Sequence, residues 1–472
     1  MKKFFTAVFC LTGFFAFSQY KITLDAPQYN EGVAYLAYHM GKNLNVADSA
    51  NVSPKGTAIF SGETKLPGGI YSIVFPGKRL TSDFFIDKAQ QIKIELKDTL
   101  QLENIKVEGS PENLLFEKYQ KFVAEKGPLL QKSRQNFLAS KTAADSLKYE
   151  NEFKELNTEI TNYRNNIIKD SPESMMATML AAMKESPYPT KIPVTRQDSL
   201  DNYNFYKEHY WDGITFLDDR IVRTPFFIPK FERYYREVIS QAPDSIIKDL
   251  DYKLLLARSA PELYKFMLNW LTDEYINPKY MGQDAVFVHL FNKYHSKGLS
   301  PWLNEKQMEI ITRRAYMQMS NLIGEQAANL SLLDSTGKIK SLYDLKADYT
   351  VVIFWDPNCG HCKEELPRID SVYRASWKAK GLKIYTVLTE NHIPQWVNYI
   401  KEHKLGEWTN VYQSEAMAEA EKKSSVAGFR QLYDVTQTPT VYLLDKDKRI
   451  IGKKLTWEQI NDLLEVKIKN KK

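Results

Sequence analysis

The chain has 472 residues, of which 43% are hydrophobic and 26% are charged, and its formal net charge at pH 7 is +6. This length is enough for about three domains. So mild a charge over so long a chain argues neither for a nucleic-acid-binding protein nor for attachment to a membrane surface.

The first residues have the features of a secretory signal peptide. Two lysines precede an apolar run from Phe4 to Phe17, which ends in an A-x-S cleavage pattern before Gln19. The run is shorter than the roughly 20 residues of a membrane-spanning helix. We therefore predict a signal peptide at residues 1–18, followed by cleavage and export to the periplasm or cell envelope. A retained membrane anchor is the alternative.

This cleavage changes the cysteine content. Cys10 lies inside the apolar run behind bulky Val8 and Phe9, which is a poor setting for lipid attachment, so we expect it to be removed. The cut also takes the formal net charge from +6 to +4 and leaves only Cys359 and Cys362. Disulfides persist in exported proteins. A bridge across two intervening residues, however, closes too short a loop to add much stability.

Residues 20–109 have the pattern of short strands separated by turns. Ile92, Ile94 and Leu96 alternate with Lys93 and Glu95, which is the period of two of a half-buried strand. The sequence predicts a small antiparallel β-sandwich with strands in segments 20–24, 33–40, 56–62, 68–77, 83–96 and 105–109.

Residues 110–323 have helical patterns and are predicted to form an all-α domain. Ser110 followed by Pro111 is typical of a helix N-terminus. A long polar stretch then follows, which suggests half of an antiparallel helical hairpin. Four methionines in the next helix are interpreted as core residues, because no His or Cys joins them as a metal ligand; these are Met175, Met176, Met179 and Met183. His289 and His295 are interpreted as packing or surface residues.

In residues 324–472 strands and helices alternate, which predicts an α/β domain with helices on both faces of the sheet. The fully apolar segment 349–355 is typical of a central strand of a parallel sheet. A hairpin turn is expected at residues 335–337, and Thr456 with Gln459 predicts a capping box at the start of the last helix. Further strands are expected at 383–390, 408–413, 440–445 and 449–455, and a helix at 393–404.

Both remaining cysteines lie in the sequence FWDPNCGHCKEELP, directly after the apolar strand. Cys359 is expected to open a helix, where free N–H groups and a partial positive charge lower the pKa of a thiol. Cys362 lies one helical turn further on the same face, about 5–6 Å away, and within reach of a disulfide. Cys359 is therefore the predicted nucleophile, and Cys362 is the thiol that resolves a mixed disulfide.

A zinc site and an inert structural bridge are two other uses of such a pair. Structural zinc takes four ligands, but the mature chain would have no further cysteine, and His361 lies between the two sulfurs. An inert structural bridge is the second alternative. Redox chemistry is favoured over both, and neither a metal nor a cofactor is expected.

The motif F-W-x-x-x-C-x-x-C-x-x-E-x-P resembles that of the exported TlpA/ResA-type thiol–disulfide oxidoreductases, which have a thioredoxin fold and belong to the AhpC/TSA–thioredoxin superfamily. A second element of the resemblance is TQTPTVYLLD, about 75 residues later. The resemblance covers about the last 145 residues. Residues 20–324 resemble, more weakly, the β and helical domains of unknown function that precede such domains in Gram-negative envelope proteins. The residues that match the motif are Phe354, Trp355, Cys359, Cys362, Glu365 and Pro367.

The resemblance implies roles for several residues. Pro439 would follow a cis peptide bond and, with Thr438, would bind an extended substrate strand. Trp355 would shield the site and contact substrate. Glu365 would act as an acid or base near Cys362, and Pro367 would kink the helix.

One departure concerns proton transfer. Thioredoxin has a buried aspartate where this chain has Ile353, so the resemblance leaves proton transfer to Glu365 or to water. Asp356 lies nearby in the loop and is assigned no role.

The dipeptide between the cysteines is expected to tune the reduction potential. His361 beside a thiolate stabilises the reduced form, which makes the disulfide more oxidising, whereas Glu365 acts in the opposite direction. We expect a potential of about −200 to −250 mV, between those of the disulfide isomerases and thioredoxin.

The predicted function is an exported thiol–disulfide oxidoreductase that acts on envelope proteins, with a membrane electron donor or acceptor as its partner. Nucleic acid is not an expected partner, and the cleaved protein is not expected to span the membrane. The direction of exchange stays open between reductase, oxidase and isomerase. One alternative is a partner-binding or scaffold protein with a thioredoxin-like docking domain. Another is a thiol peroxidase, although Asp356 occupies the place of the usual threonine.

Overall fold

The structure is a computed structural model that describes residues 19–29, 31–75, 79–81, 83–96, 105–189 and 191–469. The predicted signal peptide lies outside these residues. The chain forms two compact units, one of Met1–Ile239 with Lys253–Phe266 and one of Ser240–Tyr252 with Met267–Lys472. This division does not follow the predicted boundaries between residues 109 and 110 and between 323 and 324, which stay predictions. Within the described ranges, no helix is both long and apolar enough to cross a bilayer.

The N-terminal β region consists of two sheets, with strand orders β4-β1-β8-β9 and β3-β2-β5-β6, and β7 pairs with β5. Alternate residues of both sheets, among them Ile22, Leu36, Ile73 and Ile94, share one buried core. This core confirms the predicted sandwich. The strands are β1 (Tyr20–Asp25), β2 (Val33–Met40), β3 (Asn43–Asn51), β4 (Thr57–Gly62), β5 (Gly69–Phe75), β6 (Arg79–Leu80), β7 (Phe84–Ile86), β8 (Gln91–Leu96) and β9 (Ile105–Glu108).

Two features of this region differ from the prediction. β1 and β8 pair in parallel, so the expectation of a purely antiparallel sandwich was wrong. Strand β3 was not predicted, because its polar sequence NLNVADSAN lacks the alternation of a half-buried strand. It nevertheless pairs along the whole of β2 and forms an edge of its sheet. There the backbone hydrogen bonds, rather than buried side chains, hold it in place.

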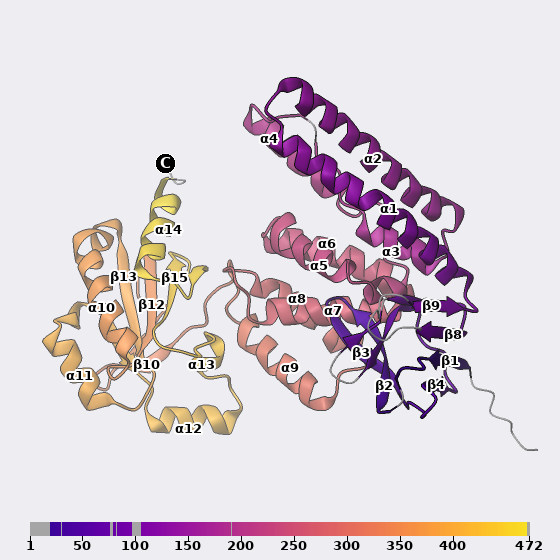
Figure 1. The fold of residues 1–472 in the computed structure, drawn as a ribbon. Helices are drawn as coiled ribbons and strands as arrows, with labels where there is room; N and C mark the ends of the chain where they lie inside the picture. The colour runs from indigo at the N-terminus through magenta and orange to yellow at the C-terminus, as the bar shows by residue number, and fades with distance from the viewer. Residues whose placement is uncertain are drawn as a thin grey trace, which may run out of the picture. The chain divides into compact units, whose positions relative to one another are not determined.

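The helices that follow are α1 (Pro111–Ala139), α2 (Ala143–Asp170), α3 (Met175–Met183), α4 (Arg196–Glu208), α5 (Phe227–Arg233), α6 (Pro243–Leu256), α7 (Pro261–Ile276), α8 (Asp284–Lys293) and α9 (Glu305–Met319). The predicted hairpin is formed by α1 and α2, which lie side by side (Figure 1). Ser110 caps α1 by accepting the N–H of Asn113.

The methionines of α3 are core residues, as predicted. Met175, Met176 and Met179 are buried in a cluster with Ile70 and Phe85 of the β region, all within the first unit. His289 and His295 also pack as predicted. His295 is hydrogen-bonded to Thr272 and Ser300, and His289 to Asp251.

The C-terminal region forms one mixed sheet of order β11-β10-β14-β13-β12-β15-β16. The central strand β12 is parallel to β13 and antiparallel to β15. The strands are β10 (Ser331–Leu333), β11 (Ile339–Ser341), β12 (Tyr349–Trp355), β13 (Leu382–Leu388), β14 (Thr409–Tyr412), β15 (Thr440–Asp445) and β16 (Ile450–Lys453). The helices are α10 (Gly360–Val372), α11 (Ile393–Glu402), α12 (Glu415–Ser424), α13 (Phe429–Leu432) and α14 (Trp457–Lys469).

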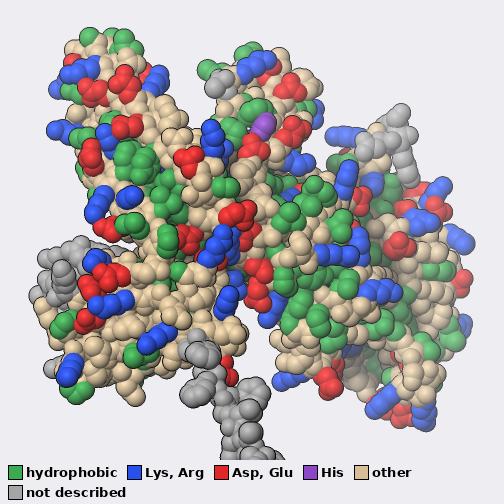
Figure 2. Space-filling view, turned by 90° about the vertical axis from the view of Figure 1, so that its right-hand side faces the viewer, with side chains coloured by type: hydrophobic (Ala, Val, Ile, Leu, Met, Phe, Trp, Pro, Cys, Tyr) green, Lys and Arg blue, Asp and Glu red, His purple; other side chains and the backbone are tan. Residues whose placement is uncertain are grey.

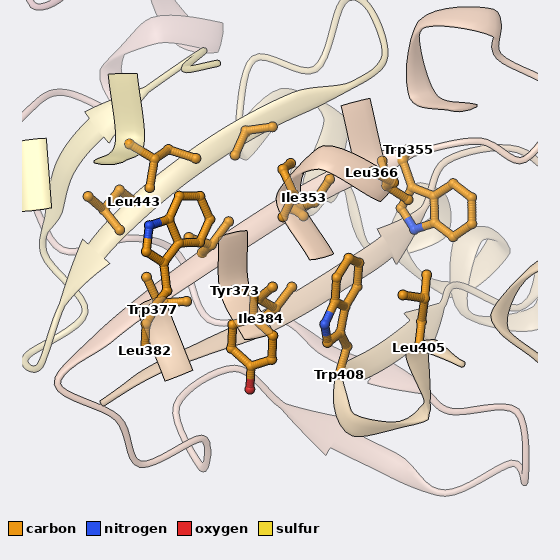
Figure 3. Packing of buried hydrophobic residues seen from close by; sticks show 14 of the residues in the cluster. Ile353, Trp355, Leu366, Tyr373, Trp377, Leu382, Ile384, Leu405, Trp408 and Leu443 are labelled. Atoms are coloured by element: carbon orange, nitrogen blue, oxygen red, sulfur yellow. The ribbon is translucent and has the colours of Figure 1, made fainter. Parts of the chain in front are cut away.

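Both faces of this sheet are covered, which confirms the predicted α/β architecture. Val351, Ile353 and Trp355 point to a core shared with α10, α11 and α14 (Figure 3). Val352 and Phe354 point to a second core, which includes side chains of α12 and α13. This explains why every residue of β12 is buried and why its sequence is apolar throughout.

The surface is mixed in charge. On the face shown in Figure 2, Lys and Arg side chains are interspersed with Asp and Glu side chains, which fits the mild net charge of the sequence.

Candidate active site

The two cysteines lie where β12 ends and α10 begins. Cys359 is the N-cap residue of α10, with extended backbone angles, and its C=O accepts the N–H of Lys363 at 3.1 Å. Cys362 lies in the first turn of the same helix and is buried. Both are free thiols. The strand–helix junction thus places one half-exposed sulfur and one buried sulfur within a single turn.

The environment of Cys359 favours a thiolate. Partial burial raises the pKa of this thiol, but hydrogen bonds from the side chain of Thr438, from the Cys362 thiol and from the N–H groups of Cys362 and His361 outweigh it, so the pKa lies below its ordinary value. Two of these donors are N–H groups at the start of the helix, as the sequence predicts. Cys359 therefore has the exposure and charge state of an attacking sulfur.

The environment of Cys362 does the opposite. Burial and, after it, the neighbouring Cys359 sulfur raise the pKa of this thiol to about 12, although the N–H of Asp356 and the side chain of Thr438 act to lower it. The pKa values of the two thiols are thus shifted in opposite directions, although the two residues are only three positions apart in the sequence. This contrast is what the predicted roles of Cys359 as nucleophile and Cys362 as resolving thiol require, and those roles stay predictions.

Thr438 and Pro439 lie directly beside the sulfurs. The peptide bond between them is cis, as predicted. The thiol of Cys359 donates to the Thr438 carbonyl at 3.3 Å. Both residues are half-buried and precede β15. The structure therefore brings together four of the predicted site residues, Cys359, Cys362, Thr438 and Pro439.

Trp355 lies beneath the site rather than on its surface. Its side chain is 0% exposed and belongs to the core shown in Figure 3. The centroid of its ring system lies 5.1 Å from that of Tyr399. These contacts give it a packing role, and its predicted contact with substrate stays a prediction.

Glu365 and His361 occupy different environments. Glu365 is half-buried, and its Oε1 accepts the N–H of Trp457 at 2.9 Å, at the first residue of α14. It therefore joins α10 to α14, a contact that the sequence pattern did not indicate. His361 is exposed beside the cysteines. The proposed proton transfer by Glu365 and tuning of the potential by His361 stay predictions.

Sequence reasoning passed over Asp356. This residue follows β12 directly and is only 5% exposed. Its Oδ2 lies 2.8 Å from Nδ1 of His392, and its Oδ1 accepts the N–H of Asn358 at 2.7 Å. A buried position was not evident from the sequence, because the residue reads as part of a loop. Its place directly after a fully apolar strand was the available signal.

Comparisons with known proteins relate two parts of the chain to protein families. Residues 323–453 match the model of the AhpC/TSA family, and residues 20–116 match a model described as a domain of unknown function, DUF4369. Over 143 residues the chain is 28% identical to the thiol-disulfide oxidoreductase ResA of Bacillus cereus, a match that covers 30% of this chain and 75% of that protein.

Residues 323–453 are a TlpA/ResA-like thioredoxin-fold oxidoreductase domain. The resemblance seen in the motif is thereby confirmed. Among solved structures, the domain of a possible thiol-disulfide isomerase from Cytophaga hutchinsonii is 36% identical, covers 32% of this chain and 95% of its own, and has a TM-score of 0.28. A thioredoxin-like protein from Bacteroides caccae is 22% identical, covers 60% of this chain and 99% of its own, and has a TM-score of 0.45.

Proposed function

We propose that this protein is an exported thiol–disulfide oxidoreductase that exchanges disulfides with envelope proteins through Cys359 and Cys362. The observation that carries the proposal is the contrast between the two thiols. Cys359 is half-exposed with a lowered pKa, whereas Cys362 is buried with a raised pKa. An inert structural bridge does not require this contrast.

The exchange proceeds in two steps. The Cys359 thiolate attacks one sulfur of a substrate disulfide, and a mixed disulfide forms as the other substrate sulfur leaves with the electron pair. Cys362 then loses its proton and attacks Cys359, which releases the first substrate sulfur as a thiolate and leaves an intramolecular disulfide. The substrate is reduced by two electrons and the enzyme is oxidised by two.

Thr438 and Pro439 are the proposed binding surface for the substrate chain. Their half-buried backbone lies against the Cys359 sulfur, and the Thr438 carbonyl is already at hydrogen-bonding distance from it. An extended substrate strand would pair with backbone groups at this point, in the manner of a strand added to a sheet edge.

The direction of electron flow depends on the partner, because thiol–disulfide exchange is reversible and the difference in reduction potential decides which side is oxidised. A membrane-bound donor or acceptor of electrons is the proposed partner. Export follows from the predicted signal peptide. Sequencing of the mature N-terminus should find Gln19 first, and a retained Met1 would contradict cleavage.

Insulin reduction in the presence of dithiothreitol tests the activity. The Cys359→Ser variant should fall to the rate of dithiothreitol alone, with an unchanged thermal unfolding curve for the reduced protein. An undiminished rate in Cys359→Ser would reject the proposal.

Trapping separates this function from that of a scaffold with a thioredoxin-like docking domain. The Cys362→Ser variant cannot resolve, so it should accumulate mixed disulfides with envelope proteins, and the double variant with Cys359→Ser is the matched control. A scaffold would retain its partners without a bond that reducing agent breaks.

A substitution at Glu365 tests its proposed role as acid or base. In Glu365→Gln the amide oxygen can still accept the N–H of Trp457, but it can no longer take up a proton. The account predicts slower exchange, about fivefold, with unchanged thermal stability. A loss of stability without a change in exchange rate would assign the residue to helix capping alone.

A further inference from the structure

A cavity of about 600 Å³ lies within the second unit and has no part in the mechanism above. Two parts of the chain form it. One is the loop of residues 277–282 between α7 and α8, together with residues of α8 and α9. The other consists of Asp434, residues 453–455 at the end of β16, and one face of α14. The cavity therefore lies between helices that precede the matched residues 323–453 and the region that contains the cysteines.

The wall of this cavity has an apolar rim that faces solvent. Tyr280 and Met281 of the loop and Val466 of α14 line the cavity, and all three are exposed although their side chains are large and apolar. Leu455 and Leu463 continue the same surface. Exposed apolar side chains that gather around one cavity, rather than standing singly, are typical of a binding site.

The charged groups of the wall are paired with one another. Asp434 is buried, with Oδ1 2.5 Å from Nη1 of Arg314 and Oδ2 2.7 Å from Nζ of Lys454. The carboxylate of Asp284 pairs with Nζ of Lys453. Because each buried carboxylate already has a cation beside it, an uncharged apolar group suits the cavity better than an ion. The two other charged residues that line it have opposite signs; these are Lys279 and Asp462.

The cavity borders the cis-proline segment on both sides. Asp434 lies four residues before Thr438 in the sequence. On the other side, the N–H of Leu455 donates to the carbonyl of Val441 at 3.2 Å, two residues after Pro439. In the sheet, β16 lies two strands from β12, which is about 10 Å, and an extended chain covers this distance in about three residues.

We propose that this cavity is a subsite for the polypeptide substrate, which takes a large apolar side chain about three to four residues from the substrate cysteine. This inference rests on the proposed function, in which an extended substrate strand lies along Thr438 and Pro439. A strand that continues past this segment reaches the cavity, where Met281 and Val466 contact its side chain. Backbone pairing at the segment then supplies affinity, and the cavity supplies specificity. The loop of residues 277–282 thereby belongs to the substrate site, although it lies outside the matched domain.

Synthetic peptide disulfides test this subsite. Each peptide has one cysteine in a disulfide with thionitrobenzoate and consists otherwise of serine and glycine, with a single leucine placed one to six residues from the cysteine on either side. The Cys359 thiolate attacks the peptide sulfur, the disulfide breaks, and the coloured thionitrobenzoate thiolate leaves with the electron pair. With the leucine about three or four residues away, the reduced native protein should react about tenfold faster than with serine there, which is the lower end of what burial of a leucine side chain gives.

Two variants probe the two sides of the cavity. Met281→Gln keeps the length of the side chain, and its amide oxygen can still accept the N–H of Lys453, which Sδ accepts at 3.4 Å. Val466→Asn changes an exposed side chain of similar size. Each variant should lower the rate with the leucine peptide about threefold to fivefold and leave the rate with the serine peptide within about twofold.

Val426→Asn is the matched control. Val426 is 62% exposed, against 53% for Val466, and is not among the residues that line the cavity. The same change of residue type therefore removes a similar amount of exposed apolar surface at a place where no substrate is expected. Both peptide rates should equal those of the native protein.

Several results would overturn the inference. These are equal rates with leucine and serine peptides at every spacing, an undiminished preference for leucine in either cavity variant, or the same loss in Val426→Asn. A native dimer that Val466→Asn converts to a monomer in sedimentation would also overturn it, because the surface would then bind a second copy of the chain. If the native protein releases no thionitrobenzoate from any peptide, the proposed function itself fails. A thermal unfolding curve of each reduced variant confirms that the compared proteins are folded.

Discussion

The two sheet-containing regions of this chain bury their strands in different ways. In the N-terminal sandwich the main core lies between two sheets, and β1 and β8 alternate between buried and less buried residues. Strands β5 and β7 are the exception, because Ile70 and Phe85 on their other face pack in a cluster with the methionines of α3. The C-terminal sheet has a core on each face, so β12 is buried along its whole length. Because both faces of this sheet are covered, reactive side chains can reach solvent only at the ends of its strands. The cysteines, the cis-proline segment and the Asp356–His392 pair all lie at one such end.

This difference predicts that a substitution can destabilise the core of the N-terminal sandwich or the core beneath the cysteines without the same effect on activity. Ile94 in the sandwich and Ile353 in β12 are both fully buried, so each change to Ala should lower the free energy of unfolding by about 2–5 kcal/mol. Only Ile353→Ala lies beneath the cysteines and should also reduce insulin turnover. Denaturant unfolding with a parallel activity assay checks this. Equal loss of activity in folded Ile94→Ala would contradict the separation.

A smaller effect is expected at the surface of the active site. His361 is exposed beside the cysteines, and removal of its side chain should destabilise the thiolate of the reduced form, which this residue is predicted to stabilise. His361→Ala should therefore make the reduction potential more negative, by on the order of 30 mV. Equilibration with glutathione of known ratio measures this shift. A shift toward positive values would mean that His361 does not stabilise the thiolate.

The smallest effects are expected at the helix caps, one in each region. Ser110 accepts the N–H of Asn113 at the start of α1, and Thr456 accepts the N–H of Gln459 at the start of α14. Each change to Ala should cost about 1 kcal/mol. The cost should be larger at Ser110, which is buried and also bonds the Asn113 side chain. Thermal unfolding compares the two, and a larger loss at Thr456 would contradict this order.

Sequence patterns predicted the C-terminal region well because its central strand, which is buried on both faces, is apolar throughout and can be recognised from its residue types. The segment predicted as a central strand, residues 349–355, is β12 residue for residue, and the capping box of Thr456 and Gln459 is present. Patterns failed where side chains do not decide the structure. β3 is held by backbone pairing at a sheet edge, and the short helices α12 and α13 stand in a polar stretch that showed no clear period.

Much of the candidate site could also be predicted, because it is formed by short local sequence motifs. The spacing of the cysteines and the Thr438–Pro439 pair are properties of local sequence, so they could be located without coordinates. The contacts of Asp356 with His392 and of Glu365 with Trp457 join segments 36 and 92 residues apart. No local pattern reports such contacts, because they depend on which strand ends and helix starts the fold brings together.

The central claim is that Cys359 attacks as a thiolate while Cys362 stays protonated and shielded. Alkylation of the reduced, folded protein by iodoacetamide across a pH series, with the modified residue located by mass spectrometry, tests it most directly. The account predicts modification at Cys359 alone, with a midpoint below the pKa of about 8.5 of an ordinary thiol, because hydrogen bonds to the sulfur lower its pKa. A Cys359 that is inert at neutral pH, titrates above that value, or reacts no faster than Cys362 would contradict the account.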